Sequence, residues 1–182
     1  MEMKQIIVID CQHDFIDGTL ACHDADEAVK KIVDYVDHNE CQVFYSLDWH
    51  TYTNESFLRN GGIWPDHCVQ NTWGASLDAR FFLLESKPNQ ENCYYKGKED
   101  TVEEYSAYYA INRDGKVLHE QINDEVIVCG IASEYCVMET VKELLKGNKR
   151  VSLLRGGLGY VDLATHNEAL KIYDQLGVDW VE

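Results

Sequence analysis

The sequence contains no apolar run that approaches the roughly 20 residues a bilayer-spanning helix needs. Its N-terminus leads directly into a short strand-like run, residues 6–9, without the charged and apolar regions that make up a signal peptide. We therefore expect neither a signal peptide nor an integral membrane role.

Basic residues are scarce as well. The chain has 16 Lys and Arg against 32 Asp and Glu, and its formal net charge is −16. That charge repels phosphate backbones and anionic lipids, so we expect neither nucleic acid nor a membrane surface as a partner. Acidity of this kind usually reflects a solvated surface and says little about a small neutral substrate.

Cysteine pairs of the CxxC type are absent, and the seven cysteines are an odd number. Cys41, Cys93 and Cys129 lie in or beside β-like runs, where a free cysteine acts as a small hydrophobic core residue. This usage is typical of a reducing compartment and not of a disulfide framework, so we expect a cytoplasmic protein.

Internal repeats, low-complexity tracts and linkers rich in Pro, Gly or Ser are also lacking. Hydrophobic residues make up 45% of the 182 residues, which argues against disorder. A chain of this length can bury roughly two-thirds of its unfolded surface. We therefore expect one domain spanning residues 1–182.

Short apolar runs typical of strands alternate with stretches of helical spacing. The expected strands are residues 5–10, 42–48, 93–95, 125–129, 150–154 and 178–181. Helical spacing marks residues 29–36 and 137–145 and, weakly, 77–84, and a capping box from Thr165 to Glu168 predicts a last helix that stops at Gly177. The alternation predicts a three-layer α/β/α fold with a six-stranded parallel sheet in the Rossmann-like order 3-2-1-4-5-6.

Four chemically capable residues fall at the ends of these strands. Asp10 closes the first strand, Asp48 closes the second, Lys96 follows the third, and Cys136 follows the fourth, in the first turn of the next helix. Ligands of an open doubly wound sheet bind outside the carboxyl ends of the strands, where the strand order reverses. We expect the four residues to share one crevice, with Asp10 facing Cys136 across it.

Cys136 occupies a suitable position for a nucleophile. With Ser133 as the helix N-cap, it would be about the third helical residue, where free backbone N–H groups favour a thiolate and can hold an oxyanion. Asp10 would accept the thiol proton and Lys96 would stabilise the thiolate. Taken singly, the three residues also fit a buried structural thiol, a loop cap and a surface lysine.

A second group of residues has metal-ligand spacing. Asp48 and His50 form an Asp-x-His pair, whose side chains can both reach one ion, and His67 from a following loop would complete a facial set. The alternative is a hydrogen-bonded loop cluster without an ion. The remaining histidines lack comparable partners and are interpreted as surface or structural residues: His13, His23, His38, His119 and His166.

At these residues the chain resembles the nicotinamidase/pyrazinamidase branch of the isochorismatase-like cysteine hydrolases. Each matching stretch is short, but together they follow the family order over nearly the whole chain. The stretches are IDCQHDF, SLDWH, WPDHC, YKG, EYSAYY and GIASEYCV. The resemblance implies a six-stranded α/β/α fold and a catalytic triad of Asp10, Lys96 and Cys136. It also implies an oxyanion hole formed by the N–H groups of Ala132 and Cys136, and a cis peptide bond before Ala132.

The resemblance further implies a divalent metal ion, often zinc, iron or manganese, held by Asp48, His50 and His67. In such enzymes the ion anchors the ring nitrogen of a pyridine, and Phe15 and Trp64 match the aromatic residues that flank the ring. The metal set separates this branch from isochorismatases and from other amide hydrolases of the superfamily.

The chain departs from the family pattern in several places. Ser133-Glu134 stands where threonine–aspartate is frequent, and residues 156–160 stand where Asp-Ala is frequent. Some relatives use a further glutamate as a metal ligand, and the segment between His50 and His67 holds no convincing counterpart, so we expect water to complete the coordination. None of these differences touches the triad.

Together with the residues above, the resemblance implies a metal-dependent nicotinamidase. It would hydrolyse nicotinamide, and pyrazinamide as a surrogate, through a Cys136 thioester, releasing nicotinate and ammonia for NAD salvage. One alternative is a related amidase or isochorismatase that acts on another small amide or vinyl ether. The other is a non-catalytic module that binds metal or senses redox state. The sequence leaves open whether the chain forms a homo-oligomer.

Overall fold

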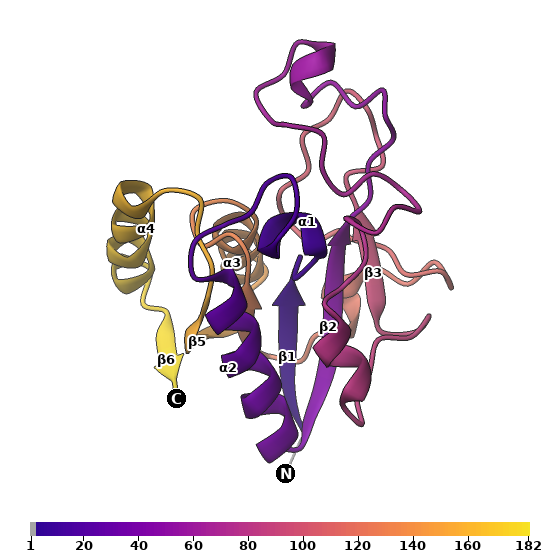
Figure 1. Ribbon diagram of the computed structural model, residues 1–182. Coiled ribbons are helices and arrows are strands. Elements are labelled where there is room, and N and C mark those ends of the chain that lie inside the picture. Colours follow the sequence, from indigo (N-terminus) through magenta and orange to yellow (C-terminus); the bar gives the residue numbers. More distant parts are fainter. Residues whose placement is uncertain (1–2) are drawn as a thin grey trace.

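A computed structural model describes residues 3–182, which form a parallel sheet with helices on both faces (Figure 1). The strand order is β3-β2-β1-β4-β5-β6, and each neighbouring pair is parallel. The strands are β1 (Lys4–Ile9), β2 (Cys41–Asp48), β3 (Cys93–Lys96), β4 (Glu125–Gly130), β5 (Arg150–Leu158) and β6 (Asp179–Val181). The α/β/α class and the strand order predicted from the sequence are both confirmed.

Two apolar clusters, one on each face of the sheet, hold the helices in place. In β1, Ile6 and Val8 belong to one cluster, whereas Ile7 and Ile9 belong to the other, because successive side chains point to opposite faces. The first cluster contains the buried face of α2, and the second contains those of α3 and α4. The α-helices are α1 (His13–Ile16), α2 (Ala25–His38), α3 (Cys136–Lys146) and α4 (Leu163–Gln175).

Two helix starts differ from the sequence prediction. Helix α3 begins at Cys136 with Tyr135 as its N-cap, because Ala132 O already accepts hydrogen bonds from Tyr135 N and Val137 N in a separate turn. Ser133 is therefore not the N-cap. Helix α4 begins before the expected capping box, with Asp162 as the N-cap accepting a hydrogen bond from Thr165 N.

The long irregular segment between β2 and β3 contains two short 3-10 helices, Leu58–Asn60 and Ala79–Leu83. The second replaces the weak helix expected at residues 77–84. A third 3-10 helix, Leu118–Gln121, precedes β4. The first of these 3-10 helices, Leu58–Asn60, and the turn after β1 lie beyond the carboxyl ends of the strands (Figure 1). The third lies near the amino end of β1, where Gln121 O accepts a hydrogen bond from Gln5 Nε2 at 3.1 Å.

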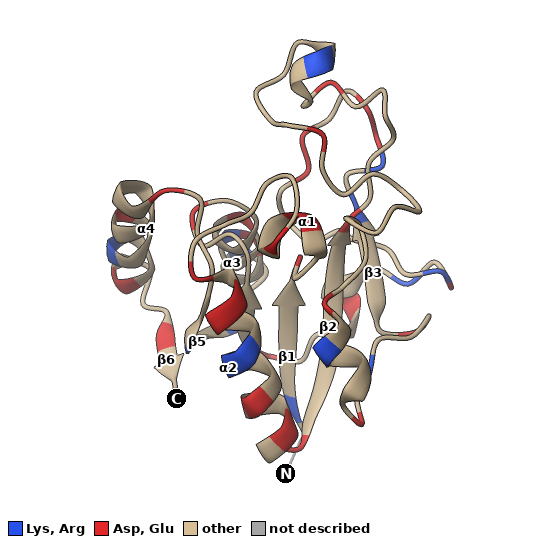
Figure 2. Ribbon diagram, in the orientation of Figure 1, with Lys and Arg blue, Asp and Glu red and all other residues tan. Residues whose placement is uncertain are grey.

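The structure also shows where the acidic residues and the cysteines lie. Acidic residues are spread over α2, α4 and several loops (Figure 2). All seven cysteines are free, and four of them are buried in the first apolar cluster: Cys11, Cys68, Cys93 and Cys129. Within residues 3–182, no helix combines the length and apolar character that crossing a membrane requires.

Candidate active site

The carboxyl ends of the central strands bring the four predicted residues together. Asp48 and Lys96 are the last residues of β2 and β3 and are directly paired in the sheet register. Asp10 follows β1, and Cys136 opens α3. Since β1 is the neighbour of both β2 and β4, the strand order reverses at this point, as expected for a ligand crevice.

Lys96 lies at the centre of the group. Its Nζ is 2.8 Å from Asp10 Oδ2, 2.5 Å from Asp48 Oδ1 and 3.5 Å from Cys136 Sγ. Lys96 is only 1% exposed, so it is not the surface lysine that this residue, taken singly in the sequence, would suggest. Burial alone would lower the pKa of Lys96, but the two carboxylates raise it well above its ordinary value and keep the ammonium charged.

Asp10 has one oxygen held by Ser46 and the other next to Lys96. Ser46 Oγ donates to Asp10 Oδ1 at 2.6 Å. Oδ2 contacts Lys96 as an ion pair without hydrogen-bond geometry, and within residues 3–182 no donor forms a hydrogen bond to it. Burial raises the pKa of Asp10 above its ordinary value, and Lys96 opposes that shift. Asp10 is therefore a carboxylate with an accepting oxygen available and an increased affinity for a proton.

Cys136 is a buried thiol in the free protein. Burial raises its pKa well above the ordinary value, and the attraction of Lys96 does not outweigh it. One carboxylate oxygen of Asp10 and of Asp48 and Sγ of Cys136 all lie within 4.8 Å of one another, so a thiol proton could pass to Asp10.

The turn from β4 into α3, residues 130–136, presents backbone N–H groups beside the thiol. Gly130 has φ +118°, and a Cβ there would lie 2.1 Å from Ile9 O, so only glycine fits. The Ile131–Ala132 peptide bond is cis, as expected from the resemblance. The N–H groups of Ala132 and Cys136 donate to no acceptor within residues 3–182, so both are available to an oxyanion.

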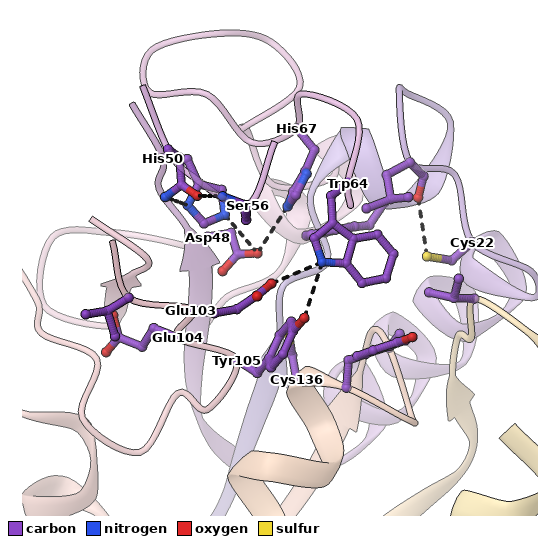
Figure 3. A pocket seen from close by; sticks show the side chains of 17 residues that line it. Cys22, Asp48, His50, Ser56, Trp64, His67, Glu103, Glu104, Tyr105 and Cys136 are labelled. Atoms are coloured by element: carbon purple, nitrogen blue, oxygen red, sulfur yellow. Dashed lines mark hydrogen bonds and ion pairs between the residues drawn. The ribbon is translucent and has the colours of Figure 1, made fainter. Parts of the chain in front are cut away.

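Asp48, His50 and His67 form the second expected group. His50 Nε2 and His67 Nε2 lie 3.5 and 3.9 Å from Asp48 Oδ2. Atoms that bind one ion at about 2.0–2.2 Å are roughly 3–4 Å apart, so this spacing suits a single metal ion. Asp48 Oδ2 is directed toward the two histidines (Figure 3), whereas its Oδ1 contacts Lys96.

Proton positions test whether an ion fits. His50 Nδ1 lies 2.7 Å from Gly97 O, and His67 Nδ1 lies 2.8 Å from Pro65 O. A carbonyl oxygen only accepts, so each Nδ1 carries a proton, and each ring in its neutral, metal-binding form turns its Nε2 lone pair to Asp48. Three electron-pair donors then face one another without a proton between them. A divalent cation fits that arrangement.

Two nearby features agree with this assignment. A Cβ on Gly97, whose φ is +70°, would lie 2.5 Å from His50 Cε1, so glycine is what lets its carbonyl approach the ring. Ser56 Oγ is buried in the same pocket without a hydrogen-bond partner among residues 3–182. By contrast, the cluster of Asp10, Asp48 and Cys136 is already filled by the Lys96 ammonium and suits no second ion.

The pocket over these groups is lined by aromatic residues, including both that the resemblance implied. Phe15 and Trp64 line it together with Tyr105, Tyr135 and Glu103. Trp64 Nε1 lies 3.1 Å from Glu103 Oε1 and 3.2 Å from Tyr105 OH, which fixes the indole at the mouth of the pocket (Figure 3). These aromatic side chains and the two histidines thus line one pocket.

Several supporting residues were missed in the sequence. Gln12 forms two hydrogen bonds with the backbone of Asp48, both at 2.8 Å, and Asp14 Oδ2 accepts from Cys68 N, next to His67. Both lie in the IDCQHDF stretch, so their motif was visible but their partners were not. His166 was interpreted as a surface or structural residue, yet its Nδ1 lies 2.6 Å from Ser133 Oγ in the turn of residues 130–136 that carries the nucleophile (the nucleophile turn).

Comparison with known proteins agrees with this geometry. The isochorismatase domain family matches residues 4–181. The nicotinamidase of Escherichia coli is 30% identical over 93% of this chain and 89% of its own. The structure of pyrazinamidase of Pyrococcus horikoshii in complex with zinc has a TM-score of 0.84 and 30% identity, covering 100% of this chain and 99% of that one. An L. infantum protein in complex with nicotinate has a TM-score of 0.85 and 27% identity, covering 99% and 92%.

Proposed function

This chain belongs to the isochorismatase family, and from that membership and the geometry of its site we propose that it is a nicotinamidase. It would be an amidohydrolase that converts nicotinamide and water to nicotinate and ammonia, with pyrazinamide as a surrogate substrate. One observation carries the proposal: Asp48 links the two parts of the site. Its Oδ1 contacts Lys96, which in turn contacts the nucleophile, and its Oδ2 faces His50 and His67, the other two candidate metal ligands. The position of Cys136 relative to the candidate metal site is thus fixed through Asp48 and Lys96.

The first half of the reaction forms a thioester. Cys136 transfers its thiol proton to Asp10 as Sγ attacks the amide carbon, and the N–H groups of Ala132 and Cys136 donate to the resulting oxyanion. Lys96 stays charged beside both Asp10 and Cys136, so its positive charge balances whichever of these two groups is negative. The C–N bond then breaks, and Asp10 returns its proton to the nitrogen, which leaves as ammonia.

The second half hydrolyses the thioester. Asp10, ionised again, takes a proton from water while the water oxygen attacks the thioester carbon. The C–S bond breaks, the sulfur recovers the proton from Asp10, and the product leaves as nicotinic acid, which releases its carboxyl proton to solvent to become nicotinate. The two halves therefore consume one water and regenerate the thiol.

Asp48, His50 and His67 would hold the divalent ion, zinc first and iron or manganese as alternatives. When bound, the ion supplies a Lewis acid for the pyridine nitrogen. Phe15 and Trp64 would flank the ring and keep the carboxamide directed at Cys136. The anchoring would orient a neutral amide in a pocket whose lining includes the carboxylates of Asp48, Glu103 and Glu104.

The reaction would contribute to NAD salvage in the cytoplasm, carried out by one domain spanning residues 1–182. Seven free thiols are compatible with a reducing compartment. The small-molecule substrate needs no nucleic acid or membrane partner.

Ammonia release from nicotinamide by the purified, metal-loaded protein tests the proposal, with and without a chelator. We expect turnover with metal, little with chelator, and none in Cys136→Ala. Metal-loaded protein that leaves nicotinamide unchanged but hydrolyses another small amide or a vinyl ether would assign it to a different activity of the family. Unchanged substrate of every kind would indicate a binding module.

A further inference from the structure

The residues of the nucleophile turn divide between the pocket and a hydrogen-bonded network. Ala132, Tyr135 and Cys136 line the pocket, whereas Ser133 and Glu134 do not. Ser133 is fully buried and contacts two side chains: its Oγ lies 3.0 Å from Glu134 Oε2 and 2.6 Å from His166 Nδ1. A residue of α4 thus reaches the turn that carries the nucleophile.

The direction of these hydrogen bonds follows from counting protons. Glu134 Oε2 belongs to a carboxylate and only accepts, so the single hydroxyl proton of Ser133 is donated to it. His166 must then donate its Nδ1 proton to Ser133 Oγ. Burial lowers the pKa of His166, so at neutral pH the ring is uncharged and its one proton is on Nδ1.

The chain of hydrogen bonds continues into the connection between β5 and α4. Glu134 Oε1 accepts from Val161 N at 2.7 Å and from Asp162 N at 2.8 Å. The backbone of Ser133 is tied to the same side of the molecule, because its N–H donates to Gly159 O at 2.9 Å and its carbonyl accepts from Tyr173 OH. His166 is therefore the α4 end of a network that fixes the residue directly after Ala132.

We propose that His166 is a positioning residue for the oxyanion-binding N–H groups of Ala132 and Cys136, acting through Ser133 and Glu134. The inference rests on the proposed function for its chemistry, although its structural part stands without it. His166 touches neither the pocket nor the nucleophile, so its effect is transmitted by the turn. The hydrogen bond that His166 Nδ1 donates to Ser133 Oγ is the contact through which this effect acts.

A packing role is the rival explanation. The His166 ring stacks on Tyr160 with centroids 4.4 Å apart, and His23 stacks on the same tyrosine at 5.4 Å. His166→Asn separates the two roles, because the asparagine amide nitrogen can take the place of Nδ1 while the ring is lost. His23→Ala is the matched control, since within residues 3–182 the His23 side chain has no hydrogen bond to the turn.

Steady-state kinetics of nicotinamide hydrolysis provide the first test. Removing an oxyanion donor outright costs about 10²–10³ in kcat, and we expect displacement in His166→Ala to cost about tenfold, with KM changed less than about twofold. His166→Asn should recover to within about threefold of the wild type. His23→Ala should keep wild-type kcat. Ser133→Ala breaks the next link and should lower kcat as His166→Ala does, which keeps the test valid if one variant fails to fold.

Two further measurements do not depend on turnover. Pyridine-3-carbaldehyde adds to the thiol as a hemithioacetal, whose oxygen needs the same N–H groups, so its affinity should fall by the same factor as kcat. Hydrogen exchange at Tyr135 and Val137, whose N–H groups both donate to Ala132 O, should accelerate in His166→Ala but not in His166→Asn.

The outcomes are distinct. Unchanged kcat and unchanged exchange in His166→Ala overturn the inference. If His166→Asn is as impaired as His166→Ala, or if His23→Ala is impaired equally, the ring acts by packing and the donor role is wrong. A wild-type protein that leaves nicotinamide unchanged refutes the proposed function, whereas the exchange experiment still decides the role of His166.

Discussion

Replacing Lys96 by methionine tests the central charge arrangement. Methionine keeps most of the volume but removes the ammonium, which leaves Asp10 and Asp48, 0% and 5% exposed, without their shared counter-ion. Breaking a buried ion pair by removing one partner costs about 3–5 kcal/mol, and here one cation serves two carboxylates. We therefore expect metal-free Lys96→Met to lose at least about 3 kcal/mol of unfolding free energy at pH 7, together with all turnover.

The loss should depend on pH in a defined direction. Without Lys96, burial raises the folded-state pKa of both carboxyl groups above the unfolded value of about 3.9. A group with a raised folded pKa favours the folded state below the unfolded pKa, and that advantage disappears as pH rises through the folded pKa. The deficit relative to wild type should therefore be largest near neutral pH and shrink as pH falls toward 4.

Urea unfolding monitored by tryptophan fluorescence at several pH values, with chelator present, measures the effect. Lys30→Met is the matched control: Lys30 also contacts two carboxylates, Asp26 and Glu27, but on an exposed face of α2, so its loss should change stability little at any pH. A Lys96→Met protein as stable as wild type at pH 7, or one with no pH-dependent deficit, would refute the charge argument.

Three further substitution tests address the chemistry. Cys136→Ala should abolish turnover with folding and metal content intact, whereas Cys129→Ala in β4 should mainly lower stability; equal loss of turnover per folded molecule would contradict the assignment of the nucleophile. Asp10→Asn should lower kcat by several orders of magnitude, and a change confined to KM would make Asp10 a binding residue. Metal removal, His50→Ala or His67→Ala should weaken nicotinamide binding in calorimetry, and benzamide, which lacks the ring nitrogen, should be a poor substrate. Benzamide hydrolysed as well as nicotinamide, or full activity in chelator with less than one equivalent of metal, would exclude ring anchoring by an ion.

Local chemistry in the sequence was sufficient for the sheet and for the identity of the principal site residues. The strands could be predicted because buried parallel strands are short, continuous apolar runs. Their order was taken from the six-stranded doubly wound arrangement that strand–helix alternation suggests. Asp10, Asp48 and Lys96 were identifiable because a polar residue that directly follows such a run must lie at the carboxyl edge of the sheet.

Tertiary structure decided the protonation states and the supporting contacts. The helix N-terminal position of Cys136 favours a thiolate, but burial raises the pKa of its thiol, Lys96 opposes that shift, and Asp10 and Asp48 add to it. His166 gave no local signal, because its partner Ser133 is 33 residues away and the two meet only when α4 packs beside the turn. A sequence pattern specifies which groups a segment carries, whereas charge and proton position depend on neighbours and solvent exclusion that exist only in the folded chain.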